Sequence, residues 1–581
     1  MNGPTSRARP NAREGPCSFA WVRAPTSIDK IADDYTRELA TLSPLLATDL
    51  GLPGHDHLMG DHSPAGHAAQ ADLHRRTLAL LDSATPLDDT DRVTVAAMRD
   101  RLGLDIEAYE AGDHLRAVSN IACPVQEFRD IFDLMPTETA DDWANIASRL
   151  AQVPDAIAGY VECLRVGADR GLLPSRLGVT DAFVQARILA TEPDSFFATF
   201  WRDARPGGSE PAPALAADLE RGARAAADAY WALADFLHDE LLGQAKRDAA
   251  VGRERYQRYS RLFVGSTVDL DETYDWGLDE LARIAAEQDA LAATIAGPGA
   301  TLTDAVAVLN ADPARLLRGT DALQAWMQHV SDQAIRELDG THFDISERMR
   351  TLECRIAPTQ TGGIYYTGPS ADFSRPGRMW WSVPAGVTEF STWSERTTVY
   401  HEGVPGHHLQ IAQAVENAAE LNLWRGLACW VSGHGEGWAL YAEKLMDEFG
   451  YLDDDGDRFG LLDSQRLRAT RVVLDLGFHL RKDAPASFGG GRWDYDKAWN
   501  LLRSNVAMEE KSLRFELHRY LTWPGQAPSY KIGQRVWEQI RDAVARDAAS
   551  RGEEFSLKDF HTRALNLGAL PLDVLREALV G

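Results

Sequence analysis

The stretch Ser27–Gly51, SIDKIADDYTRELATLSPLLATDLG, indicates the fold class of most of the chain. It opens with a serine that can cap a helix, carries apolar residues at roughly helical spacing and ends at a glycine. Alternation of apolar and polar residues with a period of two, which strands would show, is nearly absent. Similar segments follow, with Gly, Pro and Asp between them, at about residues 67–83, 90–111, 139–169, 212–245, 274–296 and 311–338. We therefore predict that residues 27–340 form a helical domain.

The sequence changes in character after about residue 345, where short aromatic and β-branched runs lie between Gly and Pro turns. Three of these runs, at residues 355–358, 363–367 and 379–383, predict two or three strands. Helical segments then resume at about residues 392–402, 407–422, 435–449, 458–481, 495–519, 530–548 and 557–565. A small sheet followed by helices predicts a mainly α (α+β) fold, in which residues 341–581 form a second domain packed on the helical one.

Charge and hydropathy exclude two classes of partner. The 581 residues include 60 Lys and Arg against 87 Asp and Glu, which gives a net charge of −27. Such a field repels nucleic acid unless a local basic face overrides it, and the sequence has no basic run. No stretch approaches the ~18 uninterrupted apolar residues of a membrane-spanning helix. We therefore expect neither nucleic acid nor membrane as a partner.

The cysteines and the N-terminal composition bear on location. The five cysteines are an odd number, no two are close, and there is no Cys-x-x-Cys pair. This spacing argues against a disulfide framework and is typical of a reducing compartment. Residues 1–26 are rich in Arg, Pro and small residues and lack the apolar core of a secretory signal, so we predict a disordered leader there. Together these features predict a cytoplasmic protein.

The stretch TVYHEGVPGHHLQ, residues 398–410, carries the most specific chemical signal. A His-Glu pair on a helix, followed by a further His on the same face, is how many zinc peptidases present two imidazoles and a general base. The usual H-E-x-x-H spacing is absent, because Pro405 stands where the second His would be. On a regular helix His407 would be turned by about 240° from His401, and the two could not share an ion. Pro405 and the nearby glycines favour a break that brings His407 back beside His401.

A third candidate ligand lies in the stretch GHGEGWALYAE, residues 433–443, which predicts a glycine-rich turn entering a helix. Glu436 would lie in the first turn of this helix, with Glu443 two turns further along the same face. Two histidines and a carboxylate that leave a fourth position open to water form the catalytic rather than the structural zinc pattern. The alternatives remain open that Glu436 is only a first-turn carboxylate favoured by the helix dipole, and that the histidine pattern arose by chance.

The strings HEGVPGHHLQ, EGWALYAEK and RYLTWPGQAPSYKIG resemble the bacterial family known as domain of unknown function 885. That family looks like a divergent branch of the gluzincin metallopeptidase clan. The resemblance runs from about Ser27 onward, and its specific motifs lie between about residues 360 and 535. It implies a two-lobed helical body with a small sheet beside an active-site cleft, in which residues 341–581 form the catalytic domain. It also implies a zinc site with the ligands His401, His407 and Glu436.

The resemblance assigns the general base and leaves the second ligand open. Glu402 would take the proton from the attacking water and pass it to the leaving amine. His407 follows a glycine, as the second zinc histidine does in related helical peptidases. Two extra residues separate the histidines relative to the clan's usual motif, so His408 is an alternative second ligand or a residue that orients the substrate.

The oxyanion that forms during amide hydrolysis needs a hydrogen-bond donor opposite the metal. Tyr530 resembles the tyrosines that related enzymes place there. His479, which Asp475 would orient, is a second candidate. For each of the two, a packed aromatic ring or a core histidine is an equal alternative.

The segment at residues 365–378 resembles the strand and turn that line the cleft in related peptidases. A strand edge beside the zinc would pair with an extended peptide backbone. We expect substrate contacts there from Tyr366, Arg375 and Arg378, and either arginine would bind a carboxylate with two hydrogen bonds. Arg471 and Arg519 are weaker candidates, since most arginines are simply solvated.

These residues predict a zinc-dependent hydrolase that cleaves amide bonds of short peptides or amino-acid conjugates. One Zn²⁺ per chain is expected, although Mn²⁺, Co²⁺ or Fe²⁺ would fit the same ligands. The same site could instead serve another reaction on a small metabolite, and a metal-free binding or scaffold protein is a third alternative. The expected partner is a small molecule or a short peptide, and the sequence leaves the oligomeric state open.

Overall fold

The computed structural model describes residues 23–357 and 363–580, with 69% helix and 5% strand. This content confirms the predicted mainly α fold with small sheets. Within the described part, no helix is both long enough and apolar enough to cross a membrane. Of the predicted leader only residues 23–26 are described, and Pro358, at the end of a predicted strand, also lies outside the described residues.

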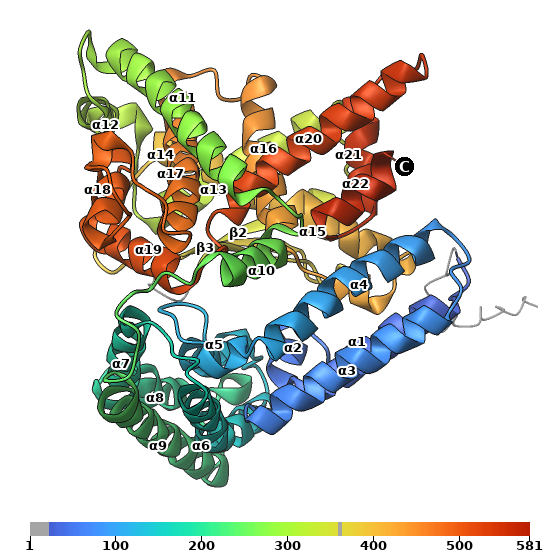
Figure 1. Cartoon of the computed structure of the whole chain (residues 1–581), viewed down its shortest axis with the longest axis vertical. Helices are drawn as coiled ribbons and strands as arrows, with labels where there is room; N and C mark the ends of the chain where they lie inside the picture. The colour runs from blue at the N-terminus through green and yellow to red at the C-terminus, as the bar shows by residue number, and fades with distance from the viewer. Residues whose placement is uncertain (1–22, 358–362, 581) are drawn as a thin grey trace, which may run out of the picture.

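The helices form two groups in space. Figure 1 shows the earlier helices, blue to teal, in the lower part of the view and the later ones in the upper part. The earlier group is α1 (Ser27–Leu42), α2 (Pro44–Asp49), α3 (Pro64–Ser83), α4 (Asp89–Glu110), α5 (Pro124–Leu134), α6 (Ala140–Asp169), α7 (Arg176–Thr191), α8 (Phe196–Thr199) and α9 (Pro213–Asp235). The later group is α10 (Arg253–Val264), α11 (Leu270–Ala296), α12 (Leu302–Ala311), α13 (Thr320–Leu338), α14 (Thr392–Glu402), α15 (His407–Glu416), α16 (Ser432–Glu448), α17 (Asp455–His479), α18 (Tyr495–Asn505), α19 (Glu510–Thr522), α20 (Ser529–Ser550), α21 (Leu557–Asn566) and α22 (Leu572–Val580).

Local sequence signals explain where several helices begin. The cap of α1 is Thr26, one residue before the predicted cap, and its hydroxyl accepts a hydrogen bond from the backbone N–H of Asp29. The Asp29 carboxylate accepts one from the backbone N–H of Thr26 in return. The same reciprocal arrangement begins α6 at Thr139 and α12 at Thr301. Such capping boxes satisfy N–H groups that the first turn of a helix leaves without a partner.

Three strands form the sheet that the sequence predicted. β2 (Leu352–Ile356) pairs in parallel with β4 (Gly377–Trp381), and β3 (Ile364–Thr367) pairs antiparallel with the other side of β4. Met379 and Trp381 of β4 are buried, as alternation along a strand predicts. β3 is therefore an edge strand of this sheet.

A second, two-stranded sheet was not predicted. It pairs β1 (Leu316–Arg318) with β5 (Glu389–Ser391) in antiparallel register. β1 falls inside the segment 311–338, which the periodicity had predicted as one helix. Pro313 and Gly319, whose φ is 81°, explain the interruption, because neither continues a helix easily.

The buried apolar side chains form two large clusters. The larger one joins α1, α3 and α4 to elements from α10 to α22. The second lies mainly within α5 to α9. Because α11 packs against α17, and α13 against α14, the larger cluster crosses residue 340, where the sequence placed a domain boundary. The core instead divides between α4 and α5 and again between α9 and α10.

Candidate metal centre

The chain between α14 and α15 breaks the helix, as the sequence predicted. His401 lies in the last turn of α14, and His407 is the first residue of α15. The Val404–Pro405 peptide between them is cis. A Cβ at Gly406 would lie only 1.9 Å from the carbonyl oxygen of His401 and 2.5 Å from that of Tyr400. The missing side chain at Gly406 therefore lets the start of α15 fold back against the end of α14.

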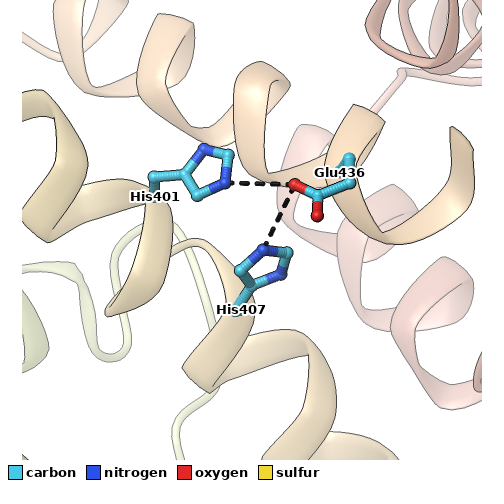
Figure 2. Close-up of side chains that lie close together, drawn as sticks. All are labelled: His401, His407 and Glu436. Atoms are coloured by element: carbon cyan, nitrogen blue, oxygen red, sulfur yellow. Dashed lines mark hydrogen bonds and ion pairs between the residues drawn. The ribbon is translucent and has the colours of Figure 1, made fainter. Parts of the chain in front are cut away.

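The fold brings together His401, His407 and Glu436, which three different helices contribute. The same Glu436 oxygen, Oε2, lies 3.2 Å from His401 Nε2 and 3.5 Å from His407 Nε2 (Figure 2). One ligand atom from each residue lies within 4.8 Å of the other two. A tetrahedral ion with bonds of about 2.0–2.1 Å needs ligand atoms about 3.4 Å apart. The spacing therefore fits a single metal ion.

Glu443 fixes the orientation of His401. Its Oε1 lies 2.8 Å from His401 Nδ1, and its Oε2 accepts hydrogen bonds from Thr397 at 2.6 Å and Ser464 at 3.1 Å. Glu443 is fully buried. A carboxylate on the far nitrogen of a histidine holds the tautomer and the ring that a metal ligand needs. Glu443, which the sequence places two turns beyond Glu436, thus contacts the ring nitrogen of His401 that faces away from Glu436.

The charges within the cluster suit cation binding. Burial alone would raise the pKa of Glu436, but the two histidines outweigh it and hold that pKa well below its usual range. Burial lowers the pKa of His401, yet the hydrogen bonds to Glu436 and Glu443 prevail and raise it to about 10. A metal ion would displace the proton of this pair, because ligands bind in their deprotonated forms.

His408 points away from the cluster, although it is the neighbour of His407. Its Nε2 lies 2.8 Å from the carbonyl oxygen of Met349 and must donate, so its Nδ1 accepts from the Tyr366 hydroxyl at 2.9 Å. Burial lowers the pKa of His408 to about 4. Both ring nitrogens are occupied, and the structure therefore places His407 rather than His408 beside His401.

The cluster lines a cavity of about 440 Å³. Glu402 also lines it, and burial raises the pKa of this carboxyl more than the nearby imidazoles lower it. A carboxylate with a raised pKa is a stronger base than an exposed one. The other described residues on the wall are Ile364, Tyr365, Tyr366, Thr398, Ile411, Trp430, Leu467, Arg468, Arg471, Met508 and Tyr530. Of the predicted substrate contacts, Tyr366 is on this wall.

Tyr530 lies on the cavity wall at the start of α20. The guanidinium of Arg471 lies 5.0 Å from the centre of its ring. Burial and the charge of Glu436 raise the pKa of Tyr530. The phenol therefore keeps its proton and can donate a hydrogen bond into the cavity.

His479 is not brought to the cavity. It is fully buried, its Nε2 lies 2.9 Å from the carbonyl oxygen of Tyr520, and its ring stacks on Tyr256. Asp475, predicted to orient it, accepts a hydrogen bond from the backbone N–H of Gly525 instead. The interpretation of His479 as a core histidine fits this environment.

Arg375 and Arg378 are likewise absent from the described residues that line the cavity. Arg378 pairs with Glu353 at 2.8 Å and lies over the ring of Trp380. Arg375 lies in the turn between β3 and β4, where its charge acts on the hydroxyl of Tyr366. The predicted carboxylate site at these arginines is therefore not supported by their placement.

Two residues on the wall, Arg468 and Trp430, were not singled out in the sequence. Arg468 lies three residues before Arg471 on α17, so helical spacing from that candidate would have pointed to it. Trp430 lies before α16 with its ring 6.4 Å from that of His407. No local motif marks Trp430.

The fold and the cluster define a helical protein with a centre of two histidines and one carboxylate in a cavity. The chain belongs to the family described as "Bacterial protein of unknown function (DUF885)", whose model matches residues 44–579. No curated protein matches the chain.

Two solved structures share the fold. The first is described as "the putative lipoprotein from Colwellia psychrerythraea"; it is 22% identical, with a TM-score of 0.81 over 95% of this chain and 98% of that one. The second is described as a "putative lipoprotein of unknown function from Shewanella oneidensis"; it is 15% identical, with a TM-score of 0.72 over 96% of this chain and 100% of that one. At these identities the likeness shows the fold alone.

These descriptions contradict the predicted cytoplasmic location, because both solved structures are described as those of a "putative lipoprotein". The prediction relied on the N-terminal composition, most of which lies outside the described residues, and on unpaired cysteines. The four described cysteines are indeed free, but all four are buried. Buried thiols are inert in any compartment, so their unpaired state does not report a reducing one.

Proposed function

We propose that the protein is a metal-dependent hydrolase that cleaves amide bonds of short peptides or amino-acid conjugates. The observation that carries this proposal is the convergence of His401, His407 and Glu436 in one cavity, with Glu402 on its wall. The same arrangement supports the proposed relation to the gluzincin clan, since a His-Glu pair on one helix and a carboxylate from another are its implied signature.

The ligand set favours Zn²⁺. Two imidazoles and one carboxylate with the remaining coordination left to solvent or substrate are typical of catalytic zinc. The buried carboxylate of Glu443 behind His401 is the supporting partner that such sites use. Mn²⁺, Co²⁺ or Fe²⁺ would also accept these ligands, so metal content must be measured. One ion per chain is expected.

The side chains on the wall supply the remaining chemistry. A bound Zn²⁺ would polarise the amide carbonyl and make water a better nucleophile at neutral pH. Glu402 accepts the proton of the attacking water and returns it to the amine as the C–N bond breaks. Tyr530 donates a hydrogen bond to the oxygen on which negative charge develops. A cavity of about 440 Å³ suits a small ligand and excludes folded proteins.

We infer that this activity is exercised outside the cytoplasm. The support is the description of both solved relatives as lipoproteins. An extracytoplasmic hydrolase would meet peptides and conjugates before they are taken up.

The proposal is tested first by metal content, measured by plasma mass spectrometry. Wild type should hold about one zinc per chain, and His407→Ala and Glu436→Ala should lose it. His408→Ala is the matched control, since this neighbouring histidine is equally buried but bonds elsewhere, and it should keep the ion. The absence of metal from all proteins would overturn the proposal.

Activity is the second test. A library of short peptides and N-acyl amino acids should be cleaved by wild type and not by Glu402→Gln, which keeps the shape of the residue but cannot accept the proton. Stoichiometric metal without cleavage of any amide would favour the alternative of another reaction on a small metabolite.

A further inference from the structure

Arg468 stands out among the charged residues of the cavity wall, because no carboxylate of the described residues forms an ion pair with it. It lies on α17 and lines the cavity wall together with Leu467 and Arg471. Among the described residues it forms no ion pair. An arginine in a protein keeps its charge, and the carboxylates of Glu402, Glu443 and Asp463 attract this one without forming an ion pair with it.

The hydrogen bonds of Arg468 leave one edge of its guanidinium free. Its Nη1 donates to the hydroxyl of Ser464 at 2.6 Å and to the carbonyl oxygen of the same residue at 3.3 Å. Its Nε is buried and has no partner among the described residues. The Nε–Nη2 edge is thus without an acceptor. The two N–H groups of that edge have the parallel geometry that a carboxylate accepts, and protein atoms cover Nε in this structure.

The second arginine of the cavity wall, Arg471, does form an ion pair. Arg471 donates to the hydroxyl of Tyr520 at 2.9 Å and to Glu516 at 2.8 Å. Arg519 shares the same Glu516 at 3.1 Å. Arg471 and Arg519 therefore pair with the same single carboxylate. Together they leave one further positive charge on this side of the cavity, in addition to that of Arg468.

The carboxylates nearest the metal centre form no hydrogen bond with Arg468, although those of Glu402 and Glu443 attract it through space. Glu436 faces the two histidines, and Glu443 is held by His401, Thr397 and Ser464. Leaving a buried N–H donor without an acceptor costs about 1–3 kcal/mol. The arrangement is explained when a ligand supplies the missing anion.

The position of Arg468 places that anion close to the metal centre. Ser464, which accepts from Arg468, donates to Glu443, and Glu443 holds His401. Only two side chains therefore separate Arg468 from the first histidine of the cluster. An anion on Arg468 would belong to the part of the substrate next to the bond that is cut.

A neighbouring cavity indicates which end of the substrate faces the arginine wall. It measures about 1180 Å³ and shares Tyr365 with the metal cavity. Its wall carries five carboxylates against one arginine, Arg129, which pairs with two of them; the five belong to Asp49, Glu127, Asp130, Asp133 and Asp203. A substrate carboxylate would be repelled there, so the carboxylate end is expected at the arginine wall and the other end toward Tyr365.

We propose that Arg468 binds the free carboxylate of the amino acid that hydrolysis releases, so that the substrates are dipeptides and N-acyl amino acids rather than internal peptide bonds. The inference rests on the proposed hydrolase function. In the reaction the amide C–N bond breaks, the water oxygen joins the acyl carbon, and the amino acid leaves as the amine with its carboxylate still on Arg468.

The test compares two substrates in the zinc-loaded enzyme: an N-acyl amino acid and the same compound with its carboxylate converted to an amide. Wild type should prefer the free acid in kcat/KM by about 10- to 100-fold, the range of a charge-assisted hydrogen bond. Arg468→Gln, which can still bond Ser464, should lose this preference through a higher KM for the acid while the amide is cut as before. Arg458→Gln, at an arginine of the same helix that pairs with Glu287 off the cavity wall, should keep the preference.

The outcomes separate the two proposals. If Arg468→Gln slows acid and amide equally, and Ser464→Ala does the same, Arg468 acts only through Glu443 and the carboxylate site is wrong. An equal rate of wild type on both substrates would overturn it as well. If wild type holds no metal and cleaves neither compound, the hydrolase itself fails.

Discussion

Glu443 shows how a residue outside the cluster controls it. It is fully buried, and it directs Nε2 of His401 toward Glu436 through its own bond to Nδ1. Glu443→Gln keeps the size of the side chain and removes the charge. We expect the dissociation constant for zinc to rise by about 10- to 100-fold, as for other residues that support metal-binding histidines. Competition with a fluorescent chelator measures it.

A matched control exists on the helix of His401. Glu395, also on α14, receives a hydrogen bond from Ser394 and touches no member of the cluster. Glu395→Gln should leave zinc affinity unchanged. Equal affinities of the Glu443→Gln protein and wild type would show that Glu443 does not support the metal site.

Asp475 gives the stability of the protein a pH dependence. Burial raises its pKa from 3.8 to about 7. Between these values the folded protein holds a proton that the unfolded chain has lost, so the stabilisation is full below about pH 4 and declines as the pH rises through 7. Asp475→Asn keeps an oxygen to accept from Gly525 and cannot titrate. The free energy of unfolding of wild type, relative to this variant, should therefore fall from pH 5 to pH 8 in urea titrations. A difference that stays constant with pH would contradict this account.

At the scale of elements, the junction of α14 and α15 depends on close backbone contact. Gly406→Ala would place a Cβ 1.9 Å from the carbonyl oxygen of His401. Backbone atoms cannot yield as a side chain would, so we expect a loss of about 1–3 kcal/mol in stability and a large loss of bound zinc. Thermal unfolding and metal content measure the two effects.

Gly426→Ala is the control for this substitution, because nothing lies within 4 Å of a Cβ at that position. Its zinc content should match that of wild type. Normal zinc in the Gly406→Ala protein would show that the junction can rearrange without losing the site.

Sequence patterns predicted this junction and much of the secondary structure. The break between His401 and His407 followed from ligand geometry and from Pro405, both of which are local. The predicted helix at residues 392–402 agrees with α14, while the predicted helix at 495–519 is two helices, α18 and α19. Helices α5, α7, α8, α10, α12 and α22 were not predicted.

The predicted site residues also divide into those that local motifs identify and those whose placement depends on the fold. The cluster lies within two motifs, so spacing along the chain was enough to find it. His479, Arg375 and Arg378 were selected by residue type, and their placement depends on packing between distant segments, such as the contact of His479 with Tyr520. Helical spacing from Arg471 points to Arg468, but only the fold shows that Arg468 lines the cavity without an ion pair.

For the whole molecule, the two clusters of buried side chains define units that the sequence did not predict. The cluster of α5 to α9 is an insertion between α4 and α10, and the helices on either side of it pack together in the larger cluster. Local periodicity identifies helices but does not say which of them share a core. A boundary near residue 340 was therefore inferred from the change of local structure alone.

Two separate cores predict two unfolding transitions, of which only one responds to the metal. The ligands lie on α14, α15 and α16, whose buried residues belong to the larger cluster. Removing zinc with a chelator should lower the midpoint of that transition, because an ion that binds only the folded state stabilises it. Leu474→Ala, in the larger cluster, should lower the same transition by about 2–5 kcal/mol of stability. Leu150→Ala, in the smaller cluster, should lower the other and leave the effect of the chelator intact. Scanning calorimetry of the three proteins, with and without metal, measures this, and one transition shifted equally by all three changes would mean that the two cores unfold as one.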